Sequence, residues 1–359
     1  MAILAFETSC DETSVAVVRD GVVLSNIVSS QIQVHAEYGG VVPELASRMH
    51  LRNLHTVAAR ALSEAGVAAA DLHAVAATQG PGLPNALMAG MGAGQGVALA
   101  LGVPFVPIHH HEAHLYSPWI CGQPLRLDMQ AFVPHISLIV SGGHTMLVHV
   151  HGILEHEVLG MTVDDAAGEC FDKVAKLMGL PYPGGVYLDR LARGGRGDAI
   201  DFPRPMLSSG DFDFSFSGLK TAVRYHLRDH PEVLSTEPLL RDLCASVQAA
   251  IVDVLSRKSL EACRAKRVGA LTVSGGVAAN SGLREALSRG CARRGLALRL
   301  ADRGLCGDNA AMVGVLAELR LKSARMVCSD AYGTELEPRP RWGLAEVSTA
   351  RGERAGAQG

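Results

Sequence analysis

Short apolar runs that flank polar turns recur along the chain. Residues 3–18 consist of an apolar run, a polar turn and a second apolar run, which is the pattern of two β-strands joined as a hairpin. The same arrangement returns at residues 136–150, where the turn is Ser-Gly-Gly-His-Thr. A third version, at residues 270–294, places a helix after a glycine-rich turn. The repetition predicts two related lobes that face a cleft.

Strands and helices alternate between these repeats. A helical pattern follows residue 43, and a strand over residues 72–77 ends in a glycine-rich turn. Residues 86–101 are rich in Ala, Gly and Met, a composition that lets a helix lie close to a sheet, and a short strand at 104–108 leads into a cluster of histidines. The order of elements predicts an α/β protein.

The repeats also suggest the limits of the two lobes. We expect an N-terminal lobe over residues 1–133 and a C-terminal lobe over residues 134–342. Within the second lobe, closely spaced Gly and Pro residues predict a loop-rich insertion around residues 180–240. The composition of residues 343–359 is typical of a disordered tail.

Composition and charge narrow the class of protein. Of the 359 residues, 48% are hydrophobic and only 4% are aromatic, so we expect the cores to rest on Val, Leu, Ala and Ile. The net charge of −3 disfavours a free-standing nucleic-acid binder and leaves open a nucleic-acid contact that partner subunits assist. The eight cysteines form no C-x-x-C pair, so neither a zinc ribbon nor a dithiol redox motif is indicated. Several of them lie within apolar patterns, where reduced, buried thiols are common. Because no basic leader and no charge-free apolar stretch of membrane length occurs, we expect a cytoplasmic protein without a membrane span.

The run His-His-His-Glu-Ala-His at residues 109–114 is the sharpest local signal. On a helix, His110 and His114 lie on one face about 5–6 Å apart, close enough to share a metal ion. A carboxylate would complete a triad suited to Fe²⁺ or Zn²⁺, and Asp308 is the best distal candidate because it precedes a predicted helix. His111 is a possible rival ligand. A zinc protease is disfavoured because its H-E-x-x-H spacing is absent.

The glycine turns at residues 141–145 and 274–280 have the form of phosphate and nucleoside binding sites, where bare backbone N–H groups approach an anion. Neither a Walker A motif nor a dinucleotide-binding fingerprint occurs in the required context. We place Asp172 in the cleft, since a carboxylate accepts both ribose hydroxyls. Lys220 fits a surface lysine better than a phosphate ligand. Carboxylates in or beside turns, some of them expected helix caps, are Asp11, Glu12, Asp164, Asp165, Asp172 and Asp189.

Taken together, these motifs closely resemble one family, the bacterial-type tRNA N6-adenosine threonylcarbamoyltransferases (TsaD), once regarded as glycoproteases. The resemblance spans nearly the whole chain in order. The matching segments are ETSCDETSVAVV (7–18), HAEYGGVVPELASRMH (35–50), HHHEAH (109–114), LIVSGGHT (138–145), DDAAGECFDKVAKLMGLPYPGG (164–185), FSFSGLKTAV (214–223), VSGGVAANSGLR (273–284) and GDNAAM (307–312). His111 departs from the family pattern, in which methionine is common at this position.

The resemblance implies a duplicated actin- and sugar-kinase-like (ASKHA) fold with two lobes around a nucleotide cleft. It also implies transfer of threonylcarbamoyl from threonylcarbamoyl-AMP to the N6 amine of the adenosine 3′-adjacent to the anticodon, in tRNAs that read codons beginning with adenine. The implied metal is Fe²⁺, with Zn²⁺ as the alternative, held by His110, His114 and Asp308. The residues implied to hold the adenine nucleotide or the intermediate are Ile139, Val140, Ser141, Gly142, Gly143, Asp172, Gly185, Asp189 and Asn280.

The same resemblance suggests a reaction and its partners. The metal polarises the carbamoyl or neighbouring carboxylate oxygens, AMP leaves into the glycine turns, and the adenosine amine attacks while Glu12 or Asp11 takes its proton. The expected partners are tRNA, a smaller paralogous subunit (TsaB) and an ATPase subunit (TsaE). The alternatives are a small-molecule kinase of the same superfamily, which does not need the two histidines, and a non-catalytic scaffold subunit, which lacks the metal set.

Overall fold

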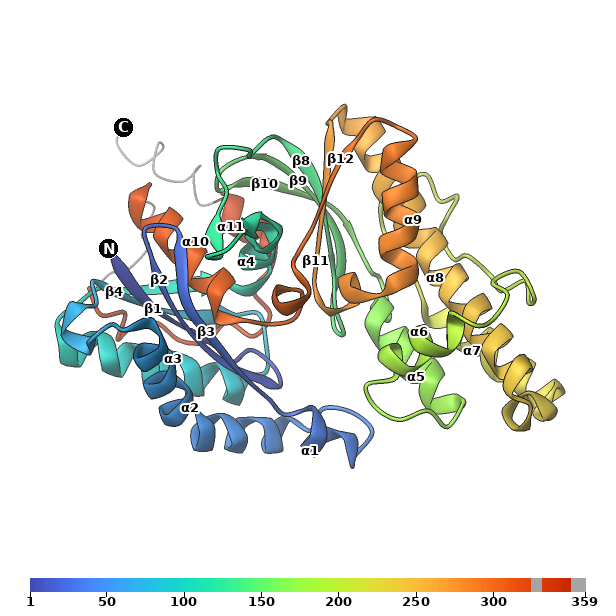
Figure 1. The fold of residues 1–359 in the computed structure, drawn as a ribbon, viewed down its shortest axis with the longest axis horizontal. Helices are drawn as coiled ribbons and strands as arrows, with labels where there is room; N and C mark the ends of the chain where they lie inside the picture. Colours follow the sequence, from blue (N-terminus) through green and yellow to red (C-terminus); the bar gives the residue numbers. More distant parts are fainter. Residues whose placement is uncertain (324–330, 350–359) are drawn as a thin grey trace, which may run out of the picture.

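The computed structural model describes residues 1–323 and 331–349, which form two lobes side by side, each built on one sheet (Figure 1). The first sheet has seven strands in the order β5-β4-β1-β2-β3-β7-β6. Its strands are β1 (Ala2–Glu7), β2 (Glu12–Arg19), β3 (Val22–Ser30), β4 (Ala74–Gly80), β5 (Phe105–His109), β6 (Ile120–Cys121) and β7 (Arg126–Leu127). The hairpin predicted for residues 3–18 is the antiparallel pair β1 and β2.

The second sheet has five strands in the order β10-β9-β8-β11-β12. Its strands are β8 (His135–Val140), β9 (Thr145–Gly152), β10 (Glu155–Met161), β11 (Ala270–Ser274) and β12 (Ala297–Leu300). β8 has antiparallel neighbours on one side and parallel neighbours on the other, and β1 has the same surroundings in the first sheet. The predicted duplication is confirmed, because both sheets repeat one five-strand pattern.

Helices occupy three layers around the two sheets. They are α1 (Ile32–Ala36), α2 (Pro43–Ala65), α3 (Pro84–Leu101), α4 (His110–Tyr116), α5 (Ala167–Leu177), α6 (Gly184–Ala192), α7 (Ser217–Asp229), α8 (Glu237–Lys266), α9 (Ser281–Ala292), α10 (Ala310–Lys322) and α11 (Leu344–Thr349). Alternate residues of β1 point to opposite faces, so Leu4 and Phe6 share a core with α2 and α3, whereas Ile3 and Ala5 share one with α10. The cluster around α4 and α10 also contains β9 residues, so these two helices lie between the sheets, and α5–α9 share a core with the other face of the second sheet.

The limits predicted for the lobes need two corrections. Helix α10 packs on β1, β2 and β3 of the first sheet, so the N-terminal lobe is not one continuous segment. The disordered tail predicted from residue 343 is wrong for residues 344–349, which form α11 with Leu344 buried against the core between the sheets. Residues 350–359 lie outside the described residues. The predicted loop-rich insertion also contains two helices, α6 and α7.

A membrane-spanning helix must be both long and apolar. Within residues 1–323 and 331–349, no helix combines these properties to the degree needed to cross a bilayer.

Candidate functional site

Helix α4 begins directly after the last parallel strand of the first sheet and carries both predicted histidine ligands. The side chain of His109 caps this helix, since its Nδ1 accepts a hydrogen bond of 3.3 Å from the backbone N–H of Glu112. Helix α10 takes the equivalent place after β12, the last strand of the second sheet, and Asp308 lies just before it. The duplicated fold therefore brings its two equivalent helix starts together at this point.

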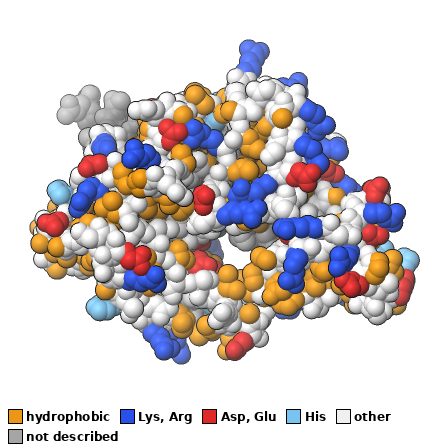
Figure 2. Space-filling model, viewed as in Figure 1, with side chains coloured by type: hydrophobic (Ala, Val, Ile, Leu, Met, Phe, Trp, Pro, Cys, Tyr) orange, Lys and Arg blue, Asp and Glu red, His pale blue; other side chains and the backbone are white. Residues whose placement is uncertain are grey.

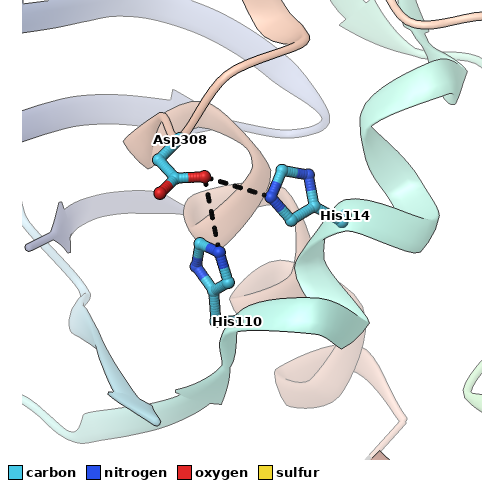
Figure 3. Close-up of side chains that lie close together, drawn as sticks. All are labelled: His110, His114 and Asp308. Atoms are coloured by element: carbon cyan, nitrogen blue, oxygen red, sulfur yellow. Dashed lines mark hydrogen bonds and ion pairs between the residues drawn. The ribbon is translucent and has the colours of Figure 1, made fainter. Parts of the chain in front are cut away.

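The structure brings the three predicted ligands together (Figure 3). Oδ1 of Asp308 lies 3.4 Å from Nε2 of His110 and 3.2 Å from Nε2 of His114. The histidine side chains are buried, and that of Asp308 is 21% exposed. Two imidazole nitrogens and one carboxylate oxygen thus converge on one small volume.

Glu7, at the end of β1, fixes the orientation of His110. Its Oε2 accepts hydrogen bonds from Nδ1 of His110 at 2.9 Å and from the hydroxyl of Thr78 at 2.6 Å, and its Oε1 accepts the backbone N–H of Ser9. A carboxylate on Nδ1 selects the tautomer that leaves Nε2 free to bind a metal. This role is not apparent from the sequence, because Glu7 lies 103 residues from His110. The only local signal is a carboxylate at the end of an apolar run.

The carboxylates and histidines at this centre shift one another's pKa values. Burial alone would raise the pKa of Glu7, but the neighbouring His110 and hydrogen bonds from His110 and Thr78 hold it below its usual value. The pKa of Asp308 also lies well below its usual value, because His110 and His114 outweigh the effect of burial. Burial opposes protonation of His110, yet Asp308 and Glu7 raise its pKa well above normal.

These residues fit a divalent metal ion. With neutral imidazoles the cluster holds two carboxylates, the fully buried Glu7 and the partly exposed Asp308, whose combined charge a dication compensates. Two histidines and one carboxylate form a donor set that suits Fe²⁺ and Zn²⁺ alike. The donor chemistry, the short separations and the Glu7 hydrogen bond all agree with the metal site that the sequence predicted.

His111 does not belong to this group of converging ligand atoms. Its ring packs edge-on against the ring of His144, with centroids 4.0 Å apart. Nε2 of His111 is buried and has no hydrogen-bond partner among the described residues. His111, the predicted rival ligand, therefore faces the glycine turn of the second lobe, which contains His144. Burial lowers the pKa of His144 to about 4, so this histidine is neutral near pH 7.

The predicted proton acceptors Asp11 and Glu12 follow β1 in the first lobe. Burial, followed by the nearby charge of Asp308, raises the pKa of Asp11. Burial also raises the pKa of Glu12 to about 7. A hydrogen bond of 2.9 Å from the hydroxyl of Ser30 to Oε1 of Glu12 acts in the opposite direction and lowers this pKa. Its second oxygen, Oε2, is buried and has no hydrogen-bond partner within the described part of the chain.

The glycine turn between β8 and β9 presents open backbone in the second lobe. Ser141 and His144 close the turn, through a backbone hydrogen bond of 2.8 Å and one of 3.1 Å from the His144 N–H to the Ser141 hydroxyl. Gly142 and Gly143 are exposed, and a Cβ on either would meet open space. The side chains of the preceding residues, Ile139 and Val140, are fully buried, so a ligand here meets backbone atoms.

The remaining predicted ligand residues take part in hydrogen bonds around α6 and α9. Oδ1 of Asp172 accepts the backbone N–H of Gly185 at 3.1 Å, and burial, helped by the charge of Asp11, raises the pKa of Asp172. Asn280 caps α9, with its Oδ1 2.9 Å from the N–H of Leu283.

Asp189 also holds the start of α9. Its Oδ1 accepts the N–H and the hydroxyl of Ser281, and its Oδ2 pairs with Arg193. Asp172, Gly185, Asp189 and Asn280 therefore lie around the starts of α6 and α9, and both oxygens of Asp189 already have partners there.

Figure 2 shows a hollow between the two lobes on the face drawn, with Lys and Arg side chains at its upper and right margins.

A second group of possible ligand atoms lies on the surface of the second sheet. It consists of His149, His151 and Glu157, and the last two are about half exposed. Nζ of Lys266 lies 3.1 Å from the Glu157 carboxylate and competes with a cation for it. The buried triad at α4 is the better candidate.

Replacing Glu7 by glutamine is expected to weaken metal binding about 10- to 100-fold, the usual effect of losing a residue that orients a ligand. Glutamine keeps the size of the side chain but removes the charge that accepts the Nδ1 proton of His110. Titration of the metal-free protein with Zn²⁺ measures the change. Glu64→Gln, at an exposed position on α2, is the control, and equal Zn²⁺ affinity in both variants contradicts the role of Glu7.

Comparison with known proteins decides the family. The family model for TsaD, tRNA N6-adenosine threonylcarbamoyltransferase, matches residues 22–315. The protein belongs to this family. A family member from Geobacter sp. strain M21 is 49% identical over 349 residues, which cover 97% of this chain and 98% of the relative. One from Chlorobaculum tepidum is 48% identical over 342 residues. Both relatives are named tRNA N6-adenosine threonylcarbamoyltransferase.

Solved structures agree with the fold. HypF of T. kodakarensis superimposes with a TM-score of 0.58 over 90% of this chain and 48% of its own, at 14% identity. Component A of (R)-2-hydroxyglutaryl-CoA dehydratase from Acidaminococcus fermentans gives a TM-score of 0.52 over 89% of this chain and 99% of its own, at 16% identity. At these identities the likeness concerns the fold alone, which is the predicted duplicated ASKHA fold.

Proposed function

We propose that the protein transfers the threonylcarbamoyl group of threonylcarbamoyl-AMP to the N6 amine of the adenosine that follows the anticodon on its 3′ side, in tRNAs that read codons beginning with adenine. The convergence of His110, His114 and Asp308 carries the proposal, in a chain 49% identical to a relative named for this activity. A kinase of the same fold has no need of this triad, and a scaffold subunit has no need of any catalytic set.

The proposed metal is Fe²⁺, with Zn²⁺ as the alternative, bound by His110, His114 and Asp308. A metal ion held by these residues would supply Lewis-acid stabilisation to an oxygen of the threonylcarbamoyl group. Glu7 holds the His110 ring in place throughout. Binding energy for the donor comes from the second lobe, where the N–H groups of the exposed Gly142 and Gly143 are available to its phosphate.

The nucleoside part of the donor is assigned to the residues around α6 and α9. Gly185 and Asn280 lie at the starts of these helices, and Asp172, in the middle of α5, accepts the backbone N–H of Gly185. A carboxylate at this place is suited to accept ribose hydroxyls. Asp189 has a weaker claim, since its oxygens already bind Ser281 and Arg193. In the transfer step the N6 nitrogen bonds to the carbamoyl carbon, the bond from that carbon to the phosphate oxygen breaks, and AMP leaves.

Glu12 is the proposed base for the N6 proton. Its Oε2 lacks a hydrogen-bond partner among the described residues, and its raised pKa suits proton transfer near pH 7. Asp11, which neighbours it and also has a raised pKa, is the alternative.

The Glu12 assignment predicts a specific pH profile. A base must be ionised to accept a proton, so kcat should rise as pH increases through about 7, the pKa to which burial raises this carboxyl. Glu12→Gln should lower kcat about 100-fold or more and remove that rise. Single-turnover rates between pH 5.5 and 8.5 measure both effects. A variant that keeps the wild-type profile would assign the base elsewhere, and Asp11→Asn tests the alternative in the same assay.

We also propose the partners and location implied by this activity: tRNA as substrate, a smaller paralogous subunit (TsaB), an ATPase subunit (TsaE), and the cytoplasm. The net charge of −3 supports a tRNA surface shared with partner subunits.

Reconstitution tests the function. The protein is combined with tRNA, threonine, bicarbonate, ATP, the enzyme that forms the intermediate and the accessory subunits, and the digested nucleosides are analysed by mass spectrometry. We expect threonylcarbamoyladenosine. Its absence, together with ATP-dependent phosphorylation of a metabolite, would favour the kinase.

A further inference from the structure

Glu112 lies between the two histidine ligands in the sequence but on the opposite side of α4. Because successive helical residues are rotated by about 100°, Glu112 points about 180° away from the midline between His110 and His114. Its side chain is 1% exposed and forms an ion pair with Arg320, whose side chain is 12% exposed. Arg320 belongs to α10, the helix that begins just after Asp308. One buried ion pair therefore joins the two elements that carry the three candidate ligands.

Helix α4 needs restraint from its surroundings because it has only seven residues, and so short a helix is not stable alone. The start of α10 is firmly attached to the first sheet, since Ser14 Oγ and Asn26 Oδ1 accept the backbone N–H groups of Ala310 and Ala311 at 2.9 and 3.2 Å. Asp308 therefore has a fixed place. The position of the histidines relative to it depends on how α4 is rotated about its own axis.

We propose that the Glu112–Arg320 ion pair is a positioning device that sets the rotation of α4 and so places His110 and His114 at binding distance from Asp308. The inference rests on the proposed metal site. A side-chain atom about 5–6 Å from the helix axis moves by about 1–2 Å when the helix turns by 10–20°. Functional sites require ligand positions held to about 0.5 Å, so a restraint on the back of α4 matters for binding.

A role in stability alone is the competing explanation, and a double substitution separates the two. Replacing a buried ion pair by apolar side chains of similar size often leaves stability unchanged. Removing only one partner destabilises the protein, because the other charge is left buried and unpaired. Glu112→Met combined with Arg320→Met should therefore keep the fold but lose the directional restraint on α4.

The experiment titrates the metal-free, full-length chain with Co²⁺ and records its visible absorption spectrum, which reports the geometry of the ligands. The double variant should unfold thermally near the wild-type temperature, bind Co²⁺ about 10- to 100-fold more weakly and show an altered spectrum. The control is Lys258→Met, which removes a buried ammonium that binds Ser209, Asp211 and Asp213 in the second lobe. It should lower stability and keep the wild-type affinity and spectrum.

Wild-type Co²⁺ affinity and spectrum in the double variant would overturn the positioning role. If the double variant does not fold, Arg320→Lys decides, because lysine keeps the charge but lacks the planar fork of arginine. A weaker Co²⁺ complex in that variant supports the proposal, and unchanged affinity overturns it. If the wild-type chain itself does not bind Co²⁺, the proposed metal centre is contradicted. This result differs from the one that overturns only the positioning role of the ion pair, in which both the wild type and the double variant bind Co²⁺ equally well.

Discussion

Replacing His110 by alanine is expected to abolish metal binding and to lower threonylcarbamoyl transfer by at least about 1,000-fold. His110 supplies one of three converging ligand atoms and is the residue that Glu7 orients. Lewis-acid stabilisation contributes several kcal/mol to a transition state, and about 1.4 kcal/mol corresponds to a tenfold change in rate. Metal content by elemental analysis and single-turnover transfer to tRNA measure the two losses.

The matched control is His55→Ala, because this histidine is exposed on α2. It should retain both metal and activity. If the His110→Ala protein folds, contains no metal and transfers threonylcarbamoyl at the wild-type rate, the reaction does not depend on the metal. Retention of metal with loss of transfer would instead make His110 a substrate ligand.

Replacing Gly275 by alanine is expected to destabilise the protein by roughly 2–5 kcal/mol. This glycine follows β11 with a φ of +92°, and an added Cβ would lie 2.2 Å from the backbone oxygen of Val140 at the end of β8. A side chain in this backbone region costs about 1–3 kcal/mol, and overpacking costs a similar amount. Because β8 leads into the glycine turn, adenine nucleotide binding should weaken as well.

Denaturant unfolding monitored by circular dichroism measures this loss of stability. The neighbouring Gly276 is the control, because a Cβ there meets open space. Gly276→Ala should change the free energy of unfolding by no more than about 0.5 kcal/mol. Equal stability of the two variants would show that the ends of β8 and β11 can separate without cost.

Features with a local signal were predicted from the sequence. The hairpins at β1–β2 and β8–β9 follow from apolar runs around polar turns. The metal-site hypothesis assumed a helix that carries His110 and His114, and this helix is α4. Asp308 was found because it precedes a helical pattern. Each of these inferences needs only neighbouring residues or a family motif.

Features that depend on contacts between distant segments were missed. Glu7 meets His110 across 103 residues, and Arg320 meets Glu112 across 208. A buried carboxylate and its partner have no shared periodicity, so the sequence does not reveal their pairing. The same holds for α10, whose packing on the first sheet follows from how the duplicated lobes face each other. Residues 344–349 were misjudged because their composition resembles a tail, although Leu344 packs into the core between the sheets.

Transfer from chemically prepared threonylcarbamoyl-AMP to an unmodified tRNA transcript tests the central claim most directly. The protein, with its accessory subunits, is assayed after removal of metal by a chelator and again after Fe²⁺ or Zn²⁺ is restored. The account predicts threonylcarbamoyladenosine from the restored protein, none above background from the stripped protein, and none from Asp308→Ala under either condition. Equal amounts of product from the stripped and restored proteins would contradict it.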